Sequence, residues 1–104
     1  MRILAGFLGL AALLMLSAPH AAQAAQPPRV SPESCGALAS TIGPRNVWQT
    51  WFRGSHRQLF DRIDWYTASP CFRTQAACKA WLYWAQTDWP LVNTFRPCRK
   101  GLGY

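Results

Sequence analysis

Residues 71–89 decide the fold, and they read Cys-Phe-Arg-Thr-Gln-Ala-Ala-Cys-Lys-Ala-Trp-Leu-Tyr-Trp-Ala-Gln-Thr-Asp-Trp. The hydroxyl oxygen of Thr74 can accept a hydrogen bond from a backbone N–H of the following turn, which is typical of a helix N-cap. From there an apolar set recurs at the i, i+3, i+4 and i+7 positions of one helical face: Cys78, Trp81, Leu82 and Ala85. The pattern predicts a helix over residues 75–86 on which the rest of the chain packs.

Residues 1–24 have the features of an export signal. Arg2 supplies the positive start, residues 3–16 form an apolar run, and Ala22-Gln23-Ala24 gives the small-x-small cleavage pattern. The run is too short for a membrane span, so an uncleaved anchor is the less favoured alternative. We therefore expect a mature protein that begins near Ala25 and is periplasmic or secreted.

All four cysteines (Cys35, Cys71, Cys78 and Cys98) follow this signal. An even number in an exported chain predicts two disulfides, and the absence of a Cys-x-x-Cys pair argues against a metal site. The extended return from the predicted helix brings Cys98 back to the start of that helix, which favours Cys78–Cys98 with Cys35–Cys71. The pairing Cys71–Cys98 with Cys35–Cys78 is second, and a Cys71–Cys78 bond is third.

Upstream of the cysteine-rich stretch, residues 25–31 read as an extended tether that frays or leads away from a membrane. Ser31-Pro32-Glu33 predicts the start of a short helix that Gly43-Pro44 ends. Residues 46–53 fit either a helix or a strand, and their β-branched and aromatic content favours the strand.

Further along, residues 55–64 predict one helical turn, and residues 64–72 predict an extended segment. Residues 91–96 predict a short strand that Pro97 confines to a sheet edge, and residues 101–104 a loose tail. The expected fold is a small disulfide-stapled α+β domain over residues 32–104. Its two short helices accompany a short antiparallel hairpin or irregular strands.

The block Cys71-Phe72-x-Thr74-x-x-x-Cys78-x-x-Trp81, preceded by Val47-Trp48 and Gly54, resembles small exported bacterial proteins of uncharacterised function. The resemblance implies export, disulfides and a strand followed by a helix. It implies no activity and no site.

Charge indicates the kind of partner. Ten of the eleven Lys and Arg residues follow residue 24, as do all four Asp and Glu, so the mature chain carries about +6. Such a chain attracts anions, and the expected partners are an envelope polysaccharide, an anionic lipid or a periplasmic protein. Solubility alone is an equally good explanation of the charge. Because the chain is exported, nucleic acid is not an expected partner.

A catalytic site is not evident. His56 lies beside Ser55, as in a nucleophile–base pair, but neighbours in sequence have no special geometry and a solvated loop histidine is favoured. No phosphate-binding loop or cluster of metal ligands is found, and we predict no catalytic residue, metal or cofactor. A hydrolase with an unrecognised site is the third functional alternative.

The carboxylates of Asp61, Asp64, Asp88 and Glu33 could in principle supply a general acid and base for glycoside cleavage. Of these, Asp61 and Asp64 are three residues apart and would share a face of a helix. They are flanked by Arg57 and Arg62, which favour the ionised form and oppose the raised pKa that a general acid needs. Surface ion pairs are the favoured interpretation.

Aromatic residues are more informative, since all six Trp, all three Tyr and four of the five Phe follow residue 24. A small core cannot absorb them all. Rings off the apolar helix face and nearby cations are therefore predicted to bind a ligand: Tyr83, Trp84, Trp89, Lys79 and Arg73. The alternative is that Trp84 and Trp89 close a second cluster against Trp48 or Trp65.

The favoured function is an exported binding module that recognises an envelope glycan, an anionic ligand or a partner protein. A cationic membrane-active effector is the second possibility.

Overall fold

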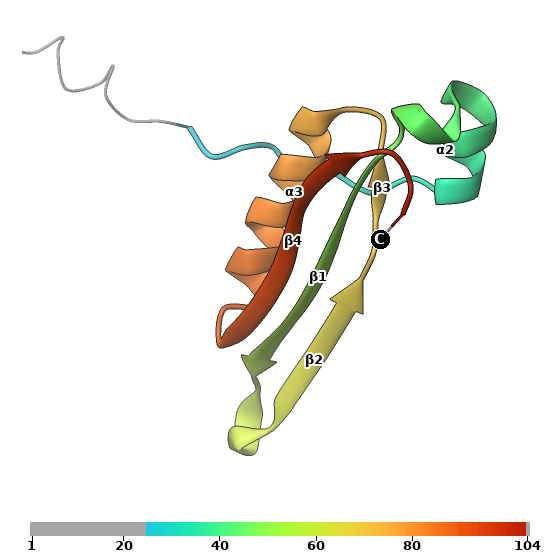
Figure 1. Cartoon of the computed structure of the whole chain (residues 1–104). Coiled ribbons are helices and arrows are strands. Elements are labelled where there is room, and N and C mark those ends of the chain that lie inside the picture. The colour runs from blue at the N-terminus through green and yellow to red at the C-terminus, as the bar shows by residue number, and fades with distance from the viewer. Residues whose placement is uncertain (1–24, 104) are drawn as a thin grey trace, which may run out of the picture.

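The computed structural model describes residues 25–103 and has two helices and a four-stranded antiparallel sheet (Figure 1). The elements are α2 (Cys35–Ile42), β1 (Trp48–Arg57), β2 (Ile63–Ala68), β3 (Cys71–Phe72), α3 (Gln75–Asp88) and β4 (Val92–Lys100), with short 3₁₀ turns at Pro44–Asn46 and Leu59–Asp61. The predicted α+β class is confirmed. The predicted export signal lies outside the described residues.

β1 is the centre of the sheet. β4 pairs with residues 48–54 of β1 along one edge, while β2 pairs with residues 52–57 and β3 with residues 48 and 49. Because β4 overlaps both of the other pairings, β2 and β3 must follow one another along the opposite edge. Figure 1 shows β3 continuing the line of β2.

The main core lies between β1 and α3. Phe52 of β1 is fully buried, and its ring meets Trp81 edge-on with ring centroids 6.1 Å apart. The four residues of the predicted helix face are all buried: Cys78, Trp81, Leu82 and Ala85. Thr74 is the N-cap, its hydroxyl accepting from the Ala77 N–H at 3.1 Å, as predicted. The helix continues two residues beyond the predicted end, to Asp88.

A smaller core lies on the other face of the sheet. Phe72 is paired with Trp48 and Cys71 with Gln49, so the adjacent side chains of Phe72 and Cys71 point to opposite faces. Phe72 joins the main core, while Cys71 packs with Leu38 of α2 and with Val47. Each helix therefore covers a different face of the sheet.

The disulfides follow the same division. Cys35–Cys71 joins α2 to β3, and Cys78–Cys98 joins α3 to β4. The favoured pairing is confirmed. The loops that they close span 36 and 20 residues, each giving about 3–4 kcal/mol in the chain-entropy model.

The predicted start of the first helix was wrong by three residues. Ser34, not Ser31, is the N-cap, and its hydroxyl accepts from the Ala37 N–H at 3.3 Å. The chain is still extended at Glu33, whose backbone N–H donates to the Cys71 carbonyl at 3.0 Å. This pairing to β3 outweighs the local helix signal of Ser31-Pro32-Glu33.

The strand preference for residues 46–53 is confirmed, and β1 extends further, to Arg57. The helical turn predicted within residues 55–64 is correspondingly reduced to the 3₁₀ turn at Leu59–Asp61 in the β1–β2 hairpin. The extended character predicted for residues 64–72 is confirmed by β2 and β3.

β4 is longer than the predicted strand but lies at a sheet edge as expected. Its register against β1 shifts between the pairs Gln49–Arg99 and Trp51–Arg96. Two residues of β4, Pro97 and Cys98, therefore stand opposite the single residue Thr50, which is a β-bulge. Proline has no N–H to give to a ladder, and a bulge on an edge strand accommodates it.

The predicted loose tail was wrong for residues 101–103. Gly101 N–H donates to the Val47 carbonyl at 2.7 Å, and Leu102 N–H donates to the Pro44 carbonyl at 3.2 Å. Gly103 N–H donates to Oε1 of Gln49 at 3.3 Å. Two backbone carbonyls just before β1 and one side chain within it thus hold residues 101–103.

Candidate functional site

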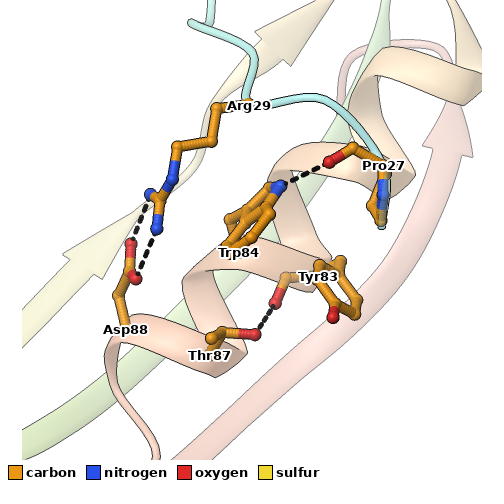
Figure 2. Close-up of polar contacts among 6 residues, drawn as sticks. All are labelled: Pro27, Arg29, Tyr83, Trp84, Thr87 and Asp88. Carbon is orange, nitrogen blue, oxygen red and sulfur yellow. Dashed lines mark hydrogen bonds and ion pairs between the residues drawn. The ribbon is translucent and has the colours of Figure 1, made fainter. Parts of the chain in front are cut away.

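The residues that precede α2 lie against α3. In this N-terminal arm (residues 25–33) the Pro27 carbonyl accepts a hydrogen bond from Trp84 Nε1 at 2.9 Å (Figure 2). The Arg29 guanidinium lies over the same indole, 4.1 Å from the ring centroid. Prolines 27 and 28 favour an extended backbone, which leaves carbonyls available to a partner. The arm is extended, but it is attached to α3 rather than frayed.

Arg29 also forms a two-pronged ion pair with Asp88 at the end of α3. Its Nη1 and Nη2 donate to the two carboxylate oxygens at 2.9 and 3.0 Å (Figure 2). These hydrogen bonds lower the pKa of Asp88 and raise the pKa of Arg29, against the opposing effect of desolvation. Both side chains are largely exposed to solvent, so the pair positions the arm more than it stabilises the fold.

Trp89, the residue after α3, lies over the sheet. Its ring is parallel to His56 at a centroid distance of 4.1 Å and nearly parallel to Tyr66 at 5.1 Å. Gly54 makes the approach possible, because a Cβ there would lie 2.8 Å from the Trp89 Cβ and 2.6 Å from a ring carbon of Phe52. The sequence thus needs glycine at this position of β1.

A pocket of about 350 Å³ lies between the arm, α3 and the sheet. Its walls are Arg29, Val30, Ser31, Tyr66, Trp81, Trp84, Ala85, Asp88 and Trp89. Four aromatic rings supply apolar surface, while the Arg29–Asp88 pair and the Ser31 hydroxyl supply donors and acceptors. Such a mixture binds small molecules that have both apolar faces and polar edges.

Two of the predicted ligand-binding residues, Trp84 and Trp89, line this pocket; the other three do not. Tyr83 is 38% exposed and meets Trp84 edge-on. Lys79 is exposed elsewhere on α3, and Arg73 Nε pairs with Glu33 at 3.0 Å. The structure therefore does not gather the predicted set into one site.

Seven of the nine lining residues were absent from the predicted set, namely Arg29, Val30, Ser31, Tyr66, Trp81, Ala85 and Asp88. Trp81 was assigned to the core alone, and Tyr66 lies in a segment predicted only as extended. Arg29 and Asp88 are 59 residues apart, and no local pattern connects them. The partners suggested for a second cluster were also wrong, because Trp48 packs on the main core and Trp65 lies against Arg53.

Ser55 and His56 do not form a pair. They are adjacent in β1 and so point to opposite faces, and the Ser55 hydroxyl donates to the Val92 carbonyl at 3.4 Å. The expectation of a loop histidine was wrong. His56 is a strand residue with a side chain 32% exposed, whose Nε2 is 3.6 Å from an Asp64 oxygen.

The carboxylates of the β1–β2 hairpin make surface contacts. Arg57 Nη1 pairs with Asp61 at 3.2 Å, as the flanking arginines predicted. Asp64 instead accepts a hydrogen bond from Gln58 Nε2 and lies beside His56. These contacts place both carboxylates in polar surroundings rather than in a pocket.

Residues 25–103 contain no group of three or more His, Cys, Asp or Glu side chains arranged to hold a metal ion. Within the same residues no helix is long and apolar enough to cross a membrane. Two disulfides indicate an oxidising environment outside the cytoplasm. Comparisons with protein-family models, curated proteins and solved structures find no match.

Proposed function

We propose that this chain is an exported binding module that holds a small saccharide in the aromatic pocket. The observation that carries the proposal is the arrangement of Tyr66, Trp81, Trp84 and Trp89 around a hollow bordered by a two-pronged ion pair. Aromatic faces pack against the C–H faces of sugar rings, and charged groups exchange hydrogen bonds with hydroxyls.

The balance of charge favours a neutral sugar. Arg29 is the one cation in the lining, and Asp88 compensates it through both carboxylate oxygens. An anion that bound Arg29 would have to displace this carboxylate. A hydroxyl can instead bridge the pair without breaking it, so a polar, uncharged ligand is the better fit.

The volume limits the ligand. About 350 Å³ is near the lower end of the range of small-molecule pockets, roughly 300–1,000 Å³. The pocket is suited to one or two sugar units, such as the end of an envelope glycan.

The test is a fluorescence titration of the oxidised protein with glucose, N-acetylglucosamine, cellobiose and chitobiose. At least one sugar should change the tryptophan emission saturably, and Trp84→Ala should weaken its binding at least tenfold. Trp65→Ala is the matched control, since this tryptophan lies outside the pocket lining. The proposal fails if no sugar binds or if the two variants lose affinity equally.

A second candidate function, binding to anionic membranes, is favoured by the tip of the β1–β2 hairpin. Leu59 is 80% exposed and Phe60 94% exposed, and Arg57 and Arg62 flank them. Apolar tip residues can enter the acyl boundary of a bilayer while arginines contact lipid phosphates.

Vesicles of phosphatidylcholine and phosphatidylglycerol provide the test of this second function. Co-sedimentation of the protein should be lost with Phe60→Ser and retained with Tyr83→Ser, an exposed aromatic on α3. Equal binding by wild type and Phe60→Ser would count against it.

A further inference from the structure

The N-terminal arm has two parts that are held in different ways. Its inner part belongs to the fold, because Val30 packs against the main core and the Glu33 N–H donates to the Cys71 carbonyl. We call residues 25–29 the outer arm. Pro27 is half-buried in it and the other four residues are exposed. The outer arm is therefore bound to the surface of α3 rather than built into the core.

The outer arm has the sequence of a short linear ligand, Ala-Gln-Pro-Pro-Arg. Proline fixes φ, and a residue that precedes proline also favours an extended backbone, so Pro27 and Pro28 favour the polyproline II conformation. A segment that is already extended loses little conformational freedom when it binds, and its carbonyls are free to accept hydrogen bonds from a partner.

Helix α3 presents the complementary groups one turn apart. Trp84 Nε1 donates to the Pro27 carbonyl, and the Asp88 carboxylate accepts two hydrogen bonds from Arg29 (Figure 2). Four residues of an α-helix rise about 6 Å, and two residues of polyproline II also rise about 6 Å. The spacing of donor and acceptor on the helix thus matches the spacing of Pro27 and Arg29 along the arm.

The helix holds its side of the contact without help from the outer arm. Trp84 meets Tyr83 edge-on with ring centroids 5.1 Å apart, and the Cys78–Cys98 disulfide fixes α3 to β4. Aromatic surfaces are the usual receptors of proline-rich segments. A carboxylate that takes both prongs of a guanidinium adds specificity for arginine over lysine. The site therefore remains formed when the outer arm leaves it.

The attachment of the outer arm is weak enough to be exchanged. The side chains of Arg29 and Asp88 are 61% and 42% exposed, and an ion pair in water contributes little to stability. The arm occupies the site because it is part of the same chain, which gives it a high effective concentration. A segment of another chain that makes the same contacts can replace it.

We propose that Trp84 and Asp88 form a recognition site for an extended Pro-Pro-Arg segment of another protein, and that the outer arm is an internal competitor for this site. The arm defines the chemistry of the partner: prolines that keep the backbone extended, a carbonyl for the indole N–H, and an arginine for the carboxylate. The disulfides indicate that the partner shares an oxidising compartment. The site shares Trp84 and Asp88 with the aromatic pocket but does not depend on a sugar there.

The experiment measures the binding of a fluorescein-labelled peptide, Ala-Gln-Pro-Pro-Arg-Val (residues 25–30), to the oxidised protein by fluorescence anisotropy. The wild-type protein should bind weakly, because its own arm competes. Arg29→Ala weakens the competitor and should lower the Kd at least tenfold. Arg57→Ala is the matched control, since it removes a similarly exposed arginine from an ion pair in the β1–β2 hairpin, and it should change the Kd less than twofold.

Two further variants, made in the Arg29→Ala protein, identify the site. Trp84→Phe keeps an aromatic ring but removes the N–H donor, and Asp88→Asn removes the charge of the acceptor. Each should raise the Kd at least tenfold. A peptide with alanine in place of both prolines, or with lysine in place of arginine, should also bind more weakly. Circular dichroism and thermal melts separate a binding defect from a folding defect.

Several outcomes would overturn the proposal. Equal Kd values for the wild-type and Arg29→Ala proteins would show that the outer arm does not compete for the site. Undiminished binding after Asp88→Asn, or to the peptide without prolines, would show that the contacts of the arm do not define the ligand. Wild-type dimers that Asp88→Asn dissociates would identify the arm of a second copy as the occupant instead of another protein. The assay contains no sugar, so its failure is distinguishable from a failure of the sugar titration.

Discussion

The Asp88 carboxylate accepts two hydrogen bonds from the guanidinium of Arg29, a residue 59 positions earlier in the chain. This contact attaches the N-terminal arm to the end of α3 and closes one side of the aromatic pocket. An arm that the sequence suggests is a tether is therefore part of the site.

The ion pair predicts a pH dependence of the arm. Hydrogen bonds from Arg29 lower the folded-state pKa of Asp88, so the contact is fully present above the unfolded pKa of about 3.8 and is lost as pH falls through the lower, folded value. The fluorescence emission of Trp84, over which Arg29 lies, should therefore change as the pH falls below about 3.8, while the disulfide-linked fold persists. Asp88→Asn should abolish this change in emission. If the change persisted in the variant, a group other than Asp88 would be responsible for it.

Gly54→Ala should destabilise the protein by about 1–3 kcal/mol, because the new methyl group would overlap Phe52 and Trp89 in a packed core. Gly36→Ala is the matched control. Its Cβ would have no neighbour closer than 4.0 Å, and alanine in helix α2 should gain about 0.5–1 kcal/mol. Thermal melts of the oxidised variants test the predicted loss of stability for Gly54→Ala and the predicted gain for Gly36→Ala. Equal changes in stability for the two variants would contradict the packing at Gly54.

Ser34→Ala should cost about 1 kcal/mol, because it removes the hydroxyl that accepts from the Ala37 N–H at the start of α2. Ser31→Ala should change stability far less, since Ser31 is not a helix cap in this fold. Urea denaturation distinguishes the two. A larger loss of stability with Ser31→Ala than with Ser34→Ala would support the helix start at Ser31 that the sequence suggests.

Replacing the pair Cys78 and Cys98 by alanine should lower stability by about 3–4 kcal/mol and loosen α3 from β4. The pair Cys35 and Cys71 should cost a similar amount but loosen α2 from β3. Hydrogen exchange would localise each effect. Peptide mapping of the wild-type protein should find both bonds and no free thiol, and any other pairing would contradict the structure.

Local and periodic features of the fold could be predicted from the sequence. Thr74 and the spacing from Cys78 to Ala85 give both the start and the buried face of α3, because capping and amphipathicity are properties of neighbouring residues. The disulfides followed from the reach of the chain after that helix. Ser31-Pro32-Glu33 led to a wrong helix start, because the backbone of Glu33 pairs with that of Cys71, a residue far away in the sequence.

The sites were harder to predict. Trp84 was chosen because it falls off the apolar face of α3, and Trp89 because a small core cannot hold every ring; both line the pocket. Arg29 and Tyr66 reach it only through tertiary contacts. Trp51 and Arg96 come from β1 and β4, and only the strand register places them side by side.

Pro97 and its bulge have a consequence for self-association. An edge strand with regularly spaced N–H and C=O groups is a template for another chain, and such edges promote aggregation. The bulge bends β4 at its middle, proline removes one donor, and Arg96, Arg99 and Lys100 add mutual repulsion between copies. The β4 edge of the sheet is thereby kept from pairing with β4 of another copy, and we expect no strand-to-strand association through this edge in concentrated solutions of the protein.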